Sequence, residues 1–278
     1  SEPIIHVFLD ANHPMGHHVF ADSANTGPWG TALVEEFIPA LEGKFGGAGV
    51  PWGRFVSGHS SGGWSSLWLQ VAYPDTFGGV WSTAPDPVDF RRFTGINLYE
   101  SASMYRDAGG NAYPLMRKEG RWVTTFEDYT RKEARVQPRG GQIFSFDAVF
   151  SDREAPGQPK LLFDRETGAI DRSVFEHWKN YDISLLLRTH WDELGPKLAG
   201  KINVFCGSED TFRLEEAVGL LDEELKKLGS DAKIVMVDGR NHFDLTQPEP
   251  THYPRGLKQR VVEEMWTTWQ AGEGAASG

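Results

Sequence analysis

The sequence predicts an α/β fold in which a mostly parallel sheet is flanked by helices and carries a large irregular insertion. Short β-prone runs alternate with longer helical runs, which is the pattern of a parallel sheet covered by helices. A chain of 278 residues is long enough to bury a sizeable core. Between residues 85 and 196 the alternation stops, and aromatic residues, glycine and arginine become frequent. We therefore interpret that segment as an insertion over the sheet.

The N-terminal part of the chain supplies the first elements of this scheme. A helix is expected at residues 31–45, bent near Pro39, and another at residues 61–72, where Pro74 closes the run. The β-prone runs predict strands at residues 4–9, 54–56 and 79–82. Strands and helices in this order form a parallel sheet.

The C-terminal part resumes the alternation. Strands are expected at residues 201–205 and 233–237, and apolar residues at helical spacing predict a helix at 214–228 between them. A last helix is expected at residues 256–270. Residues 1–84 and 197–271 would form the core, residues 85–196 the insertion, and residues 272–278 a disordered tail.

Charge and composition limit the partners and the compartment. The formal net charge is −11 and lysine and arginine do not cluster, which argues against nucleic acid as a partner. No apolar run approaches 18 residues, so we expect a soluble protein without a membrane span. The single cysteine, Cys206, excludes an intrachain disulfide. The compartment stays open, and secretion or export to the periplasm after removal of an upstream segment is one alternative.

The stretch GHSSGG at residues 58–63 fits the pattern Gly-x-Ser-x-Gly with Ser60 in the middle position. Between a strand and a helix, such a turn projects the serine clear of the sheet, and glycines let the neighbouring chain pass close. The amide of Ser61 would stand at the start of the helix, where unpaired donors favour a negative oxygen. We interpret Ser60 as a nucleophile and the Ser61 N–H as an oxyanion donor.

A nucleophilic serine needs a base, and the base needs an acid that orients it. The strand at 201–205 is followed by CGSEDTF, which contains Asp210, and the strand at 233–237 is followed by DGRNHF, which contains His242. The order serine, acid, histidine is that of the α/β-hydrolase arrangement. We therefore predict a triad of Ser60, Asp210 and His242.

Other side chains compete for these roles. Glu209, and Asp86 or Asp89 in the segment PDPVDF, are alternative acids. For Glu209 and Asp86 the simpler interpretation is a solvated loop carboxylate, or an aspartate that makes local backbone hydrogen bonds in a turn. The cluster NHPMGHH, with His17 and His18, suggests a metal site, but no Glu-x-x-His or cysteine pair accompanies it. We expect no metal and no cofactor, and place His17 and His18 at the rim of the active site.

Four segments together resemble the putative-esterase branch of the α/β-hydrolase fold, which includes esterase D-like, feruloyl and enterochelin esterases and the mycolyltransferases. The segments are GHSSGGW, GSEDTF, GRNHF and FADSANTGPWGTALVEEFIPALE. The resemblance covers roughly residues 4–84 and 197–246. It implies a cofactor-free serine hydrolase that acts on carboxylic esters with Ser60, Asp210 and His242 as its triad.

The predicted function is therefore a serine carboxylesterase that works through an acyl-enzyme. The insertion carries Phe90, Phe93, Tyr99, Tyr105, Tyr113, Phe144 and Phe146, and an aromatic wall built from them would suit short acyl chains or aryl groups. The substrate would be a small-molecule or carbohydrate-linked ester. The alternatives are an acyltransferase, or a carbohydrate-binding or scaffold module without catalysis.

The second oxyanion donor has two candidate sources. Residues 4–9 could be the strand that carries it, with a backbone amide near Asn12, or they could be the strand after it. We favour the second interpretation, in which upstream strands belong to a longer polypeptide. The sheet edge would then pair with an upstream domain or with a second copy.

Overall fold

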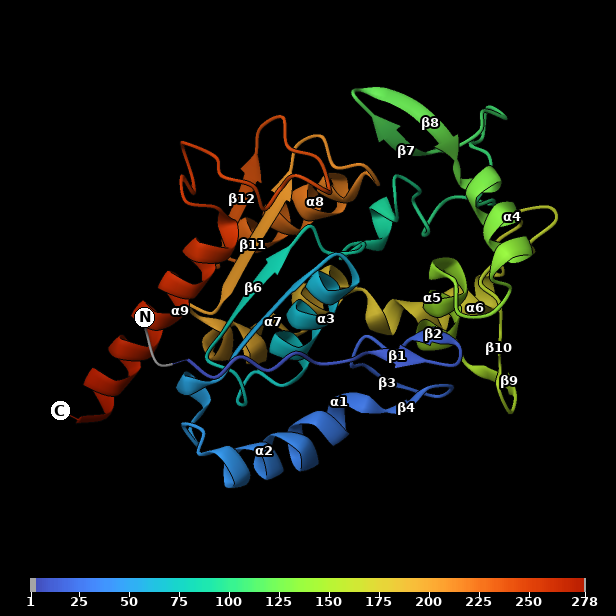
Figure 1. Cartoon of the computed structure of the whole chain (residues 1–278). Coiled ribbons are helices and arrows are strands. Elements are labelled where there is room, and N and C mark those ends of the chain that lie inside the picture. The colour runs from blue at the N-terminus through green and yellow to red at the C-terminus, as the bar shows by residue number, and fades with distance from the viewer. Residues whose placement is uncertain (1–3, 278) are drawn as a thin grey trace.

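The computed structural model describes residues 4–277 and is built around a parallel sheet of four strands (Figure 1). The strands are β5 (Phe55–His59), β6 (Gly79–Thr83), β11 (Ile202–Gly207) and β12 (Lys233–Val237), in the spatial order β12-β11-β6-β5. All three neighbouring pairs are parallel. The predicted α/β class and the four strands from residue 54 onward are confirmed.

Helices cover both faces of this sheet. On one face α3 (Ser61–Ala72) packs on β5 and β6, α8 (Leu214–Lys227) packs on β11 and β12, and α7 (Ile183–Leu198) lies between the two helices. On the other face α9 (Leu257–Ser277) packs on β6, where Trp81 Nε1 donates to Glu264 Oε2 at 2.6 Å. Successive side chains of a strand point to opposite faces of the sheet. The next residue of β6, Ser82, therefore points to the first face, where its Oγ donates to Gly63 O of α3.

The predicted helix before β5 is present and starts slightly earlier. It consists of α1 (Trp29–Ala32), a π-helical segment η1 (Leu33–Phe37) and α2 (Ile38–Phe45). A 3-10 turn, η2 (Pro51–Gly53), then leads into β5. The irregular hydrogen-bond pattern of η1 comes just before Pro39, which has no N–H to donate.

The predicted strand at residues 4–9 is wrong. Residues 4–11 form neither helix nor strand, and the first pairings are the short hairpins β1 (Asn12–His13) with β2 (Gly16–His17) and β3 (Asp22–Ser23) with β4 (Gly27–Pro28). Ile5 is 56% exposed and Phe8 95%. A β-prone run needs a neighbouring strand and a face to bury, and the described sheet gives these residues neither.

The insertion is more regular than the sequence suggested. It contains η3 (Phe90–Arg92), the hairpin of β7 (Pro114–Lys118) and β8 (Arg121–Thr125), α4 (Phe126–Val136), α5 (Gln142–Phe150), the pair β9 (Arg153–Ala155) and β10 (Gln158–Pro159), α6 (Arg172–Trp178) and η4 (Lys179–Tyr181). Figure 1 shows most of these elements grouped beside the sheet. Helix α5 is buried almost all round, so its sequence has no amphipathic period.

Most of the aromatic residues expected to form a substrate wall pack inside the protein. Phe90, Phe93, Tyr105 and Phe146 are at most 5% exposed, and Phe93 meets Phe146 edge-on with centroids 5.2 Å apart. They bury the insertion in the main core, so the expected aromatic wall is wrong for these four. The expected disordered tail is wrong as well where the structure describes it, because α9 continues through Ser277. In α9, Gly272 lies directly against the ring of Trp52 from η2.

Candidate active site

Ser60 stands at a strained turn between β5 and α3. Its backbone has φ 59° and ψ −122°, in the left-handed half of conformational space that non-glycine residues avoid. The Ser60 N–H donates to Thr83 O of the neighbouring strand at 3.0 Å. A Cβ on Gly58 would come within 2.1 Å of Gly62 O, so the chain can make this turn only with glycine at 58. The geometry is that of a nucleophile turn.

A buried carboxylate lies behind the residue after Ser60. Ser61 Oγ donates to Asp86 Oδ2 at 2.6 Å, and Gln142 Nε2 of α5 donates to the same oxygen at 2.9 Å. Asp86 is only 6% exposed, which corrects the expectation of a solvated loop carboxylate. Burial raises the pKa of Asp86, and the Ser61 hydrogen bond opposes this in part. Asp86 therefore helps to fix Ser61, and among the described residues no hydrogen bond joins it to His242.

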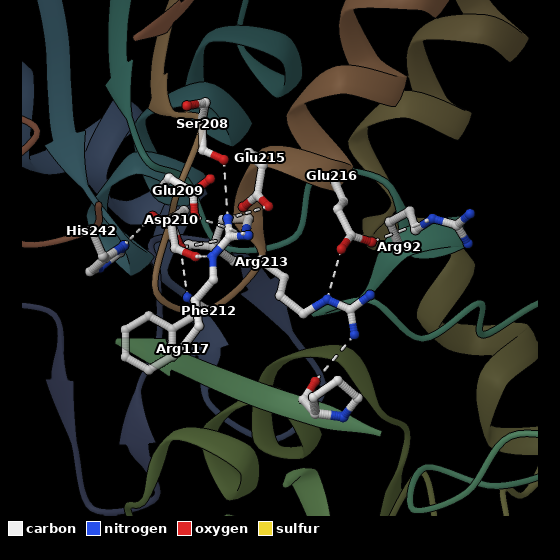
Figure 2. Close-up of polar contacts among 12 residues, drawn as sticks. Arg92, Arg117, Ser208, Glu209, Asp210, Phe212, Arg213, Glu215, Glu216 and His242 are labelled. Atoms are coloured by element: carbon white, nitrogen blue, oxygen red, sulfur yellow. Dashed lines mark hydrogen bonds and ion pairs between the residues drawn. The ribbon is translucent and has the colours of Figure 1, made fainter. Parts of the chain in front are cut away.

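The structure brings Asp210 and His242 together (Figure 2). Asp210 Oδ2 lies 2.8 Å from His242 Nδ1, and the two residues are 0% and 5% exposed. The other oxygen, Oδ1, accepts from the backbone N–H groups of Phe212 at 2.8 Å and Leu214 at 3.4 Å. Asp210 follows β11 and His242 follows β12, and neighbouring parallel strands end at the same edge of the sheet. Glu209, the competing acid, has a side chain that is 50% exposed.

The turns that carry Asp210 and His242 are joined through their backbones. Ser208 N–H donates to Val237 O and Glu209 N–H to Arg240 O, both at 2.9 Å. A Cβ on Gly207 would come within 2.1 Å of Arg240 O, so glycine is needed for this contact. These contacts hold Asp210 and His242 at a fixed spacing.

Ser60 is at the same sheet edge, but no hydrogen bond joins it to His242 within residues 4–277. The residue before it, His59, contacts His242 directly: their ring centroids lie 4.6 Å apart. His59 Nδ1 also lies 3.0 Å from Thr83 Oγ1. Burial, and then the charge on His242, lower the pKa of His59, so His59 stays neutral beside His242. Catalytic hydrogen bonds are often long before substrate binds.

Two aromatic side chains beside His242 escaped the sequence reasoning. Phe212 and Phe243 meet the imidazole edge-on, with centroids 5.0 Å and 5.4 Å away. Phe243 is 71% exposed, which is unusual for a phenylalanine. Both stand in the segments GSEDTF and GRNHF that carry Asp210 and His242. Their positions just after Asp210 and His242 in the sequence were the signal that could have found them.

The histidines of the NHPMGHH segment have separate partners. His17 Nε2 lies 3.1 Å from Gln142 Oε1, which connects it to the Asp86 network, whereas His18 stacks on Trp29 at 4.1 Å. Burial lowers the pKa of His18 to about 4. Across the described residues, no three side chains of His, Cys, Asp or Glu are placed to hold a metal ion. The Asn12 amide, one candidate oxyanion donor, is already bonded to Asp10 Oδ1 at 2.9 Å.

Residues 12–187 match the sequence model of the family described as putative esterase. The chain belongs to this family. The match includes Ser60 and ends before Asp210 and His242. Membership confirms the α/β-hydrolase fold that the resemblance predicted.

Solved structures with a similar chain trace are enzymes of low sequence identity. A ferulic acid esterase is 14% identical with a TM-score of 0.43, over 82% of this chain and 61% of its own. The fluorophosphonate-binding serine hydrolase F of Staphylococcus aureus is 12% identical with a TM-score of 0.46, over 91% and 68%. The S-formylglutathione hydrolase of Agrobacterium tumefaciens is 17% identical with a TM-score of 0.37, over 81% and 56%. No curated protein matches the sequence. None of the helices within residues 4–277 is both long and apolar enough to cross a membrane.

Proposed function

We propose that the chain is a serine carboxylesterase with Ser60 as nucleophile, His242 as base and Asp210 as the orienting acid. The observation that carries the proposal is the buried Asp210–His242 pair, with Oδ2 and Nδ1 2.8 Å apart, at the sheet edge where Ser60 is held at positive φ. A buried carboxylate on Nδ1 selects the tautomer whose other nitrogen, Nε2, is free to accept a proton.

The reaction follows from these roles. His242 Nε2 takes the proton of Ser60 Oγ as that oxygen attacks the ester carbonyl, and the Ser61 N–H donates to the developing oxyanion. Collapse expels the alcohol, which takes the proton back from His242, and leaves the acyl group on Ser60. Water then attacks the acyl-enzyme by the same route and releases the acid.

Replacing the nucleophile tests this proposal most directly. Ser60→Ala is expected to lower kcat for p-nitrophenyl acetate by at least about 10³-fold. Ser57→Ala is the control, because Ser57 is exposed in the same strand and its hydroxyl donates to Trp81 O of the neighbouring strand. A fluorophosphonate probe should label the wild type and Ser57→Ala once per chain, and leave Ser60→Ala unlabelled. Folded wild-type protein that resists labelling would point to a binding module.

Phe243 and Phe212 supply the aromatic surface next to the histidine, so we propose aryl esters, or esters of short acids, as the substrate class. Phe243→Ala should raise KM for p-nitrophenyl acetate about three- to tenfold, since an aromatic contact contributes about 0.5–1.5 kcal/mol. KM for methyl acetate should change less than twofold. Phe45→Ala is the control, because Phe45 is also exposed but ends α2. Equal changes in KM for both esters would contradict the aryl preference.

A further inference from the structure

One arginine of the insertion contacts the turn that carries Asp210 (Figure 2). Arg117 lies in β7, about ninety residues before that turn in the chain. Its Nε donates to Asp210 O at 2.9 Å and its Nη2 to Ser208 O at 3.1 Å. The backbone N–H of Arg117 donates to Thr211 O, also at 2.9 Å. Three carbonyls of one four-residue turn are therefore bonded to a single residue of the insertion.

The guanidinium is held in place from its other sides. Nη2 also donates to Glu215 Oε1 at 2.5 Å, and Nη1 lies 3.5 Å from Glu209 Oε2. The Trp122 ring of β8 covers the group, with its centroid 5.8 Å from Cζ. The Arg117 side chain is 15% exposed. Because the planar fork binds several acceptors at fixed angles, it orients the turn more firmly than a lysine could.

Arg117 holds the backbone of the acid turn and leaves the carboxylate to the histidine. The two carboxylate oxygens of Asp210 accept from backbone amides and face His242, and neither is bonded to Arg117. A guanidinium on the carboxylate itself would compete with the imidazole. A guanidinium on the carbonyls fixes where the carboxylate points without that competition.

We propose that Arg117 is a positioning residue for the triad, through which the β7–β8 hairpin of the insertion sets the orientation of Asp210 toward His242. This inference rests on the proposed function and adds to it a residue from outside the sheet core. It makes the hairpin part of the catalytic apparatus, although Arg117 itself bonds neither Ser60 nor His242.

The matched control is Arg213, whose side chain also contacts the β7–β8 hairpin. Its Nη1 donates to Pro114 O at 3.2 Å, its Nε pairs with Glu216 at 2.7 Å, and its Cζ lies 5.4 Å from the Trp122 centroid. Its side chain bonds none of the carbonyls of the acid turn. A purely structural role of hairpin docking would make Arg117 and Arg213 equivalent.

Two readouts test the proposal on the full chain. The first is the low-field proton NMR signal of the proton between His242 Nδ1 and Asp210, assigned by its loss in Asp210→Asn. The second is kcat and KM for p-nitrophenyl acetate. Arg117→Ala should shift or broaden the signal and lower kcat about 10–100-fold with KM within twofold, because small misplacement of a catalytic group has effects of this size. Arg213→Ala should leave both near wild type.

Arg117→Lys keeps the charge but not the fork, and is expected to lie between wild type and Arg117→Ala. If Arg117→Ala does not fold, Arg117→Lys is compared with Arg213→Ala in its place. Arg117 variants that are folded and match Arg213→Ala in signal and kcat would overturn the proposal. Failure of the proposed function is recognised separately, by Ser60→Ala keeping its activity, and the NMR comparison then still decides whether Arg117 positions Asp210.

Discussion

The turn that holds Ser60 and the turn that holds Asp210 are stabilised by different means. Around Ser60 the backbone is shaped by residues within a few positions, above all by Gly58 against Gly62 O, and by the adjacent strand through Thr83 O. Around Asp210 the backbone carbonyls of Ser208, Asp210 and Thr211 are bonded by Arg117 of the insertion. The first turn is local in the sequence, and the second depends on a contact across the chain.

This difference separates two kinds of constraint on one active site. A turn that depends on a glycine within it can be recognised in the sequence as a short motif, because the close backbone approach leaves no room for a side chain at that position. The distant guanidinium that holds the second turn leaves no mark in the turn's own sequence, because many loops could present such a group. Substitutions in the insertion are therefore expected to disturb the positions of Asp210 and His242 more than that of Ser60.

The largest effect should come from breaking the local turn. In Gly58→Ala the added Cβ would collide with backbone at Gly62, so we expect a loss of about 1–3 kcal/mol in the free energy of unfolding. That corresponds to roughly 2–4 °C in Tm for each kcal/mol. Activity should fall with it, since the collision lies under Ser60. Thermal and denaturant unfolding measure the change.

Gly62→Ala is the matched control, because a Cβ at Gly62 meets no atom within 4 Å and the residue is helical. Its stability should equal or slightly exceed that of the wild type, since alanine favours helix. Equal losses from the two substitutions would show that the turn is not governed by the Gly58 contact.

A smaller effect should appear in the pH dependence of the Tm, through the side chain that pairs with Arg117 beside the turn at residues 208–211. Burial raises the pKa of Glu215, the partner of Arg117, to about 7 against the attraction of Arg117. The stability that this carboxyl contributes is fully present below its ordinary value of 4.5 and is lost as pH rises through about 7. The Tm of the wild type relative to Glu215→Gln should therefore fall by about 2–4 °C between pH 5 and pH 8.

Arg117, Asp210 and Glu216 are the charged groups that act on Glu215, and all three are kept in both proteins. Glu209→Gln is the control, because Glu209 also pairs with Arg117 but its side chain is half exposed. Its Tm difference from the wild type should be the same at both pH values. A pH-independent difference for Glu215→Gln would argue against a buried ionising partner of Arg117.

The parts of the fold that follow local patterns were predictable. Residues 61–72 and 233–237 have the predicted bounds, because each run carries its own stop signal or β-prone composition. The run at 4–9 has the same composition but lacks a neighbouring strand, so local propensity misled there. Helix α5 of the insertion was missed because it is buried on nearly all sides and has no polar face to mark its period.

The candidate site divides in the same way. The chain positions of Ser60, Asp210 and His242 after three strands suggested the triad, and the structure adds the Asp210–His242 pairing. Gln142 and Arg117 reach the site through tertiary contacts over 81 and 93 residues, which no short motif encodes. His59 and Phe243 instead adjoin Ser60 and His242 in the sequence. The assignment of the three triad roles stays a prediction until Ser60→Ala is assayed.

The backbone conformation of Ser60 also has a practical use. Glycine tolerates φ near 59° at little cost, whereas other residues at such angles cost about 1–3 kcal/mol. Ser60→Gly would thus remove the side-chain oxygen and relieve the backbone strain at the same residue. The resulting protein would be a more durable receptor for an uncleaved ester than Ser60→Ala, which keeps the strain. Crystals of that variant soaked with an aryl ester would show which side chains surround the acyl group.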